Sequence, residues 1–204
     1  MSLIDGCLLK YTPPNKGKVT IGGRVYPTVK IGNQWWMAEN LDETVGILGG
    51  DEYYYSNNES KYGWNGYKCG RLYSYKSAIT LLNNKLSDWG ISSEGWRLPT
   101  KSDFQNLVGI SVNRLPICAI PNSVTSGFPN DAWAGTNALG FNALPAGQYT
   151  SGFYNIGDRT LFWSQTPDGS NFYMLAMEYR WNGAFINSTS TDNWVSIRLV
   201  KDST

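Results

Sequence analysis

The chain has 204 residues, of which 41% are hydrophobic, 14% aromatic and 16% charged. Seventeen Lys and Arg against sixteen Asp and Glu give a net charge of +1, which excludes the basic surface of a duplex-binding protein. The absence of histidine excludes a Ser-His-Asp triad, a Cys-His pair and imidazole-ligated zinc.

The three cysteines, Cys7, Cys69 and Cys118, lie far apart and form no C-x-x-C metal motif. They allow one disulfide and one free thiol, and the sequence does not decide whether Cys69 and Cys118 are bridged. No stretch approaches the roughly 20 apolar residues of a membrane-spanning helix.

Residues 1–18 read as a polar, proline-containing tether, and residues 19–204 as the globular domain. Three β-prone runs open the domain, separated by Gly-Gly and Gly-Asn dipeptides that suit tight hairpin turns. They are Val19–Ile21, Arg24–Ile31 and Gln34–Ala38. This pattern predicts a three-stranded meander, which is followed by a long connection rich in aromatic residues, glycine and asparagine over residues 42–71.

Two helices are expected in the middle of the chain. The first begins near Leu72, because five apolar side chains recur at helical spacing: Leu72, Tyr75, Ile79, Leu82 and Leu86. The second begins at Thr100, which forms a capping-box pattern with Asp103 after the helix-stopping Pro99.

Five further strands are expected after residue 110, between turns rich in Gly, Asn, Pro and Asp. They are residues 141–144, 147–149, 161–164, 172–180 and 194–201. Strands, then two helices, then more strands indicate an α+β fold.

Several motifs, taken together and in order, resemble a known family. The segment Val25–Leu41 resembles the opening of the Fibrobacter succinogenes major paralogous domain. Further family motifs follow in the same order: Gly70–Tyr75, Glu94–Thr100, Leu139–Gly147, Phe162–Ser164 and Ser196–Val200. The resemblance spans roughly residues 22–201.

The resemblance implies a C-type-lectin-like architecture with two helices and short, mostly antiparallel, twisted strands. It also implies a secreted or cell-surface location in Bacteroidetes-like bacteria, and no established enzyme activity or cofactor comes with it. Family members usually carry a cysteine just before Glu94 and another where Leu199 stands. Both are absent here, as expected if a single disulfide was lost, and this weakens the case for an oxidising compartment.

The tryptophans of the family motifs are interpreted as scaffold. Trp35, Trp36 and Trp96 are expected in the core, although a Trp pair also resembles a sugar-stacking platform. Arg97 is expected to hold loops together through a carboxylate or backbone carbonyls.

The stretch from Pro167 to Trp194 is the candidate binding region, because Tyr, Trp, Ser, Asn and Gly are favoured in recognition loops. The resemblance to C-type-lectin-like domains also places the ligand surface in this half of the chain. The candidate ligand-binding residues are Tyr179, Arg180, Trp181, Asn182, Asp192, Asn193 and Trp194. Polar turns between core strands remain an equally supported interpretation.

No catalytic or metal site is predicted. Asp168, Asn182, Asp192 and Asn193 offer oxygen donors for calcium, but Asn and Asp in turns more often serve backbone geometry. No spacing selects a glycosidase carboxylate pair, with Glu94 and Glu178 as one example.

The expected function is therefore non-catalytic binding or adhesion at a bacterial surface, or as a secreted module. The expected partner is a carbohydrate or a cell-surface receptor, with weak single sites strengthened by multivalent display. No cofactor and no nucleic-acid partner are expected. Two alternatives stay open: a phage or prophage structural protein of the virion that binds a host receptor, and a polysaccharide-acting enzyme.

Overall fold

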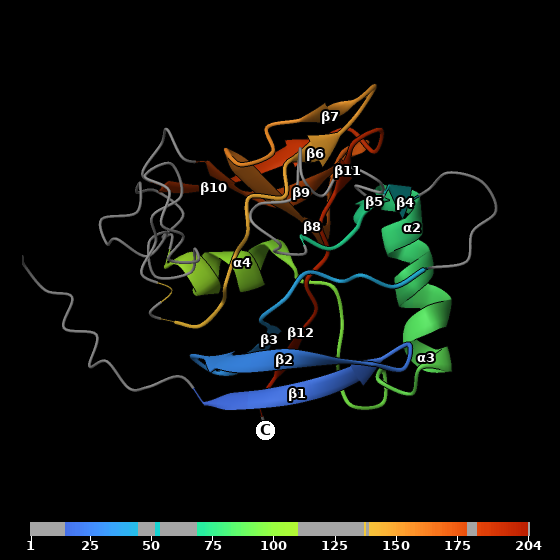
Figure 1. Ribbon diagram of the computed structural model, residues 1–204, viewed down its shortest axis with the longest axis vertical. Helices are drawn as coiled ribbons and strands as arrows, with labels where there is room; N and C mark the ends of the chain where they lie inside the picture. Colours follow the sequence, from blue (N-terminus) through green and yellow to red (C-terminus); the bar gives the residue numbers. More distant parts are fainter. Residues whose placement is uncertain are drawn as a thin grey trace, which may run out of the picture.

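The computed structural model describes residues 15–44, 52–53, 69–109, 137, 139–178 and 183–203 (Figure 1). Within these residues, short helices accompany mostly antiparallel strands arranged in three sheets. The α+β class expected from the order of elements is thus observed.

The predicted N-terminal meander is confirmed and gains a fourth strand. Strands β1 (Lys16–Ile21), β2 (Arg24–Ile31) and β3 (Gln34–Met37) pair in antiparallel order, and β12 (Val200–Asp202) pairs with β3. Strand β1 begins at Lys16, three residues before the strand expected from Val19, because Lys16 already pairs with Val29. The first turn uses Gly22 and Gly23, both at positive φ.

The first predicted helix begins later than the apolar spacing indicated. Leu72–Ser74 form strand β5, which pairs with β4 (Glu52–Tyr53) and β11 (Trp194–Val195). Leu72 and Tyr73 are fully buried, and these long-range pairings override the local helical pattern. The helical segment then runs through α2 (Tyr75–Thr80), the π-helical turn η1 (Leu81–Lys85) and α3 (Leu86–Asp88).

The second predicted helix is confirmed as α4 (Lys101–Val108). The Thr100 side chain accepts a hydrogen bond from the Asp103 backbone N–H, and the Asp103 carboxylate accepts one from the Thr100 N–H. Gly109 ends the helix in the left-handed conformation.

The C-terminal strands form two further sheets. One has the order β10-β9-β8, from β8 (Arg159–Asp168), β9 (Asn171–Glu178) and β10 (Gly183–Thr189). The other has the order β4-β5-β11-β6-β7, with β6 (Gln148–Tyr149) and β7 (Phe153–Tyr154).

Two of the expected C-terminal strands are corrected, and one further strand was not expected. Residues 141–144 form no strand; Phe141 is instead buried, and its backbone carbonyl accepts a hydrogen bond from Arg198. The run 194–201 is divided into β11 and β12, with the fully buried Arg198 between them. Strand β10 was missed, since its polar Asn-Ser-Thr sequence resembles a loop, yet it pairs with β9 over seven residue pairs.

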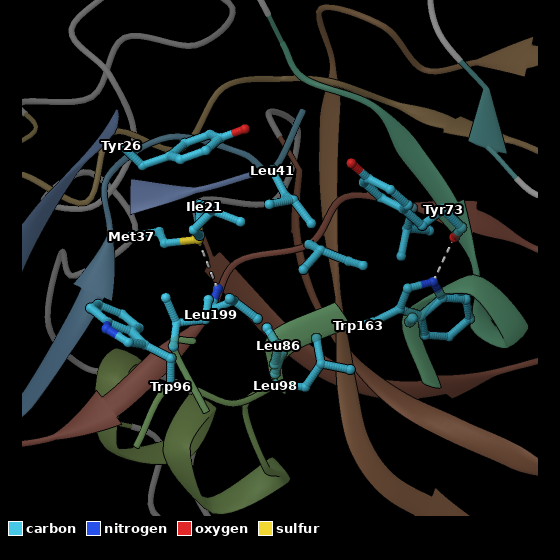
Figure 2. Packing of buried hydrophobic residues seen from close by; sticks show 14 of the residues in the cluster. Ile21, Tyr26, Met37, Leu41, Tyr73, Leu86, Trp96, Leu98, Trp163 and Leu199 are labelled. Atoms are coloured by element: carbon cyan, nitrogen blue, oxygen red, sulfur yellow. Dashed lines mark hydrogen bonds between the residues drawn. The ribbon is translucent and has the colours of Figure 1, made fainter. Parts of the chain in front are cut away.

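The core has two clusters of buried side chains. One contains Tyr26, Tyr73, Trp96 and Trp163, and Figure 2 shows Tyr26 and Trp96 on one side and Tyr73 and Trp163 on the other, with Leu41 and Leu199 between them. The other surrounds Trp36, which packs against Phe104 and Phe141 at centroid distances of 5.9 and 5.7 Å. The predicted core role of Trp36 and Trp96 is therefore confirmed, and Trp35 is half-buried against the first cluster.

Candidate binding surface

Three half-buried aromatic side chains lie in a row across β7, β6 and β11. We call Phe153, Tyr149 and Trp194 the aromatic row. Tyr149 contacts Phe153 edge-to-face at 5.0 Å between ring centroids, and Trp194 edge-to-face at 5.4 Å. These are favourable geometries for aromatic pairs, so the three rings hold one another in place.

Strand register explains why the three rings share one face. Tyr149 lies opposite Phe153 in one antiparallel pair and opposite Trp194 in the other. Directly opposed residues of neighbouring strands point to the same side of a sheet. One side of the row packs against the core cluster that contains Trp36, and each of the three residues is partly exposed.

A tight hairpin positions the row, and Gly147 makes that hairpin possible. Gly147 has φ +68°, and a Cβ there would collide with the backbone carbonyl of Tyr154. Its N–H donates to the Arg159 carbonyl at 2.7 Å, which ties the start of β6 to β8. Tyr154 on β7 is 48% exposed and is hydrogen-bonded to Ser151 at 3.2 Å between the two hydroxyl oxygens.

The turn before Trp194 is held by its own polar side chains. The Ser190 hydroxyl donates to the Asp192 carboxylate at 3.0 Å and accepts from the Asp192 N–H at 3.2 Å. The Asn193 amide donates to the Thr189 hydroxyl at 2.7 Å. Asp192 and Asn193 thus serve turn geometry, whichever further contacts they make.

The predicted binding residues are divided between two places. Asp192, Asn193 and Trp194 follow the end of β10, whereas Tyr179, Arg180, Trp181 and Asn182 lie outside the described residues. The residues that flank this second group, Glu178 and Gly183, pair at the other end of the β9–β10 hairpin. The seven residues of β10 span about 20 Å, so the two groups are attached to opposite ends of one strand.

Sequence reasoning missed Tyr149 and Phe153, which complete the aromatic row with Trp194. Their signal was a short aromatic hairpin, Gln148–Tyr154, about 40 residues before Trp194. Only the pairing of β6 with β11 brings this hairpin beside Trp194, and no local pattern encodes that pairing.

The predicted role of Arg97 is confirmed. Its guanidinium donates to the Asp103 carboxylate at 2.5 Å and reaches Asp202 at 3.3 Å, so it joins α4 to β12. These hydrogen bonds raise the pKa of Arg97, and the bond to Asp103 has the largest effect.

Cys69 is a buried free thiol, and burial raises its pKa to about 11. The disulfide considered for Cys69 and Cys118 is therefore not observed at Cys69, and Cys118, like Cys7, lies outside the described residues. A thiol of this kind is a poor nucleophile, because burial disfavours the thiolate.

No group of three or more Cys, Asp or Glu side chains gathers for a metal ion among the described residues. None of the helices described is long and apolar enough to cross a membrane.

Together, the fold and this surface define an α+β domain with a half-exposed aromatic face on short hairpin strands. The model of the Fibrobacter succinogenes major domain matches residues 29–201, and the chain belongs to that family. No curated protein and no solved structure gives a significant match to the chain.

Proposed function

We propose that this protein is a non-catalytic binding module that recognises carbohydrate, and that the aromatic row is its contact surface. The single observation that supports this most strongly is the row itself. Rigid aromatic rings provide contact area at little cost in conformational entropy, and their faces suit the apolar faces of sugar rings.

Polar groups around the row fit the same proposal. Thr150 and Ser151 follow Tyr149 in the turn of the β6–β7 hairpin and are at least partly exposed, and Asn193 precedes Trp194. Hydroxyl and amide groups both donate and accept hydrogen bonds, as sugar hydroxyls do. Shallow surfaces of this type bind weakly, so useful affinity requires several copies acting together.

The wider setting is part of the proposal. We infer a C-type-lectin-like arrangement, in which the C-terminal half of the domain carries the ligand surface. We also infer display on a bacterial cell surface or secretion from the cell, with a glycan or cell-surface receptor as the partner.

The test is retention of the protein on a panel of immobilised polysaccharides, compared with the Trp194→Ala variant. We expect the native chain to be retained by at least one polysaccharide without releasing reducing sugar, and Trp194→Ala to lose at least tenfold in affinity. Trp194→Phe, which keeps an aromatic face, should restore part of the loss.

Trp89→Ala is the matched control, because Trp89 is also half-buried but packs against the other core cluster. It should bind like the native chain, with far-ultraviolet circular dichroism confirming that all variants fold. Equal retention of the native protein and Trp194→Ala would show that the aromatic row is not the contact surface. Release of oligosaccharides would show that the protein cleaves the polysaccharide.

A further inference from the structure

We propose that the ligand of the aromatic row is an uncharged glycan, recognised without any ion pair. This inference rests on the proposed function and specifies its ligand class. It is drawn from the distribution of charge around the row, compared with what an anionic sugar would need.

The strands that carry the row contain no charged residue. Strands β5, β6, β7 and β11 have none, and the continuous described segment 139–157, which includes the whole β6–β7 hairpin, has none either. Strand β10, which leads to the turn before Trp194, is also uncharged over Gly183–Thr189. Charged residues make up 16% of the sequence, so about three would be expected in the nineteen residues of 139–157 alone.

Among the described residues next to the β6–β7 hairpin and to Trp194 in the chain, none supplies a free cation for a ligand. Arg159 follows the hairpin, but its guanidinium holds the Glu178 carboxylate with bonds of 2.5 and 3.1 Å. Asp158 and Asp192 are both exposed, and each is an acid. These described neighbours of the row in the chain therefore carry net negative charge, which opposes a carboxylated or sulfated sugar.

Anion recognition in proteins relies on arginine forks or lysine ammonium groups placed at the ligand. Arg180, the cation among the residues predicted from sequence, follows β9 at the end of the hairpin opposite Thr189. Strand β10 thus separates its attachment point from the turn that carries Trp194.

What the surface does offer is neutral hydrogen-bonding capacity next to aromatic rings. Thr150, Ser151, Ser190 and Thr191 are at least partly exposed on the two turns, and the exposed Asn155 follows β7. Groups of this kind match unmodified hexose or pentose hydroxyls, and their contribution is nearly independent of ionic strength.

The experiment is affinity electrophoresis of the full chain in gels containing either neutral or anionic polysaccharide. The neutral set is hydroxyethylcellulose, galactomannan and arabinoxylan; the anionic set is polygalacturonate, alginate and heparin. We expect retardation only in the neutral set, and an apparent Kd that changes less than about twofold between 50 and 500 mM NaCl.

Each outcome separates the two proposals. Retardation by an anionic polysaccharide that weakens with salt and disappears in Trp194→Ala overturns the uncharged ligand but keeps the row as a glycan site. Salt-sensitive retardation that disappears in Arg180→Ala and survives in Trp194→Ala overturns both. Migration unaffected by all six polysaccharides also overturns both.

Discussion

Arg198 shows how much a single side chain holds in this fold. It is fully buried, and its guanidinium donates to four separate oxygens: Asn40 Oδ1 and the backbone carbonyls of Met37, Phe141 and Asn142. Rings of Phe141 and Phe162 lie 4.5 and 5.4 Å from its central carbon. Burial lowers the pKa of Arg198 to about 9, and the charge of the Glu39 carboxylate offsets only part of this effect. The five-donor fork is used almost completely, so lysine cannot replace it.

We predict that Arg198→Lys lowers the free energy of unfolding by about 3 kcal/mol, since one ammonium cannot reach the acceptors on both chain segments and leaves buried carbonyls unsatisfied. Urea denaturation followed by tryptophan fluorescence measures the change. Arg24→Lys is the control: its half-buried guanidinium pairs with Asp42 at 2.7 Å, and we expect a loss below about 1 kcal/mol. Similar losses in both variants would show that Arg198 acts only as a charge.

At the scale of elements, the start of α4 joins three parts of the molecule. The Asp103 carboxylate accepts from Arg97, from the Gln34 side-chain amide at 2.5 Å and from the Thr100 N–H at 2.6 Å. Burial alone would raise the pKa of Asp103, but these hydrogen bonds outweigh burial and lower the pKa below its ordinary 3.8. The helix cap is therefore also the junction between α4, β3 and β12.

We predict that Asp103→Asn costs about 2 kcal/mol at pH 7, because it removes a charged acceptor shared by Arg97, Gln34 and Thr100. The pKa of Asp103 is lower in the folded than in the unfolded state, so ionised Asp103 stabilises the fold above pH 3.8. That stabilisation is lost as the pH falls through the folded-state pKa. The difference in the free energy of unfolding between the native chain and Asp103→Asn should thus be constant from pH 5 to 7 and shrink below pH 4.

Thermal unfolding at a series of pH values measures this difference. Asp88→Asn is the control, because Asp88 is exposed and, among the described residues, forms its one ion pair with Lys85, at 3.5 Å. A difference that persists unchanged at pH 3 would mean that Asp103 contributes through packing and not through its charge.

Elements with local signals could be predicted from sequence, and elements defined by pairing could not. The Thr100–Asp103 cap and the glycine turns of the N-terminal meander are written in adjacent residues, and all of these appear in the structure. The start of β5 and the whole of β10 depend on strands far away in the chain, and their own sequences favoured a helix and a loop.

At the scale of the whole molecule, the candidate site was only partly within reach of the sequence. Trp194 was selected for its residue type and its place in the C-terminal half, whereas Tyr149 and Phe153 become its neighbours only through the order β11-β6-β7. The absence of charged residues from 139–157 can be read from the sequence, but only the strand order places this segment beside Trp194.

The two ends of the described chain meet in one sheet, and this closure stabilises the whole fold. Strand β12 pairs with β3, Arg97 and Val200 exchange backbone hydrogen bonds of 3.0 and 2.9 Å, and the Ser203 N–H donates to the Asn33 carbonyl at 2.8 Å. Val200 is fully buried against the core cluster around Trp36. The last strand therefore covers the edge of β3 and anchors the segment before α4.

We predict that truncation after Leu199 abolishes cooperative unfolding. Losing the buried Val200 side chain costs about 2 kcal/mol and each lost backbone hydrogen bond about 1 kcal/mol, which together approach the total stability of a domain this size. Near-ultraviolet circular dichroism and urea denaturation check the result, with Asp202→Asn as the control because its carboxylate is 70% exposed. A truncated chain that unfolds cooperatively at the native urea midpoint would show that β12 does not contribute to the stability of the fold. The exposed ion pair of Asp202 is removed in both proteins. If the truncated chain loses stability and Asp202→Asn does not, the stabilisation therefore comes from strand pairing and from Val200.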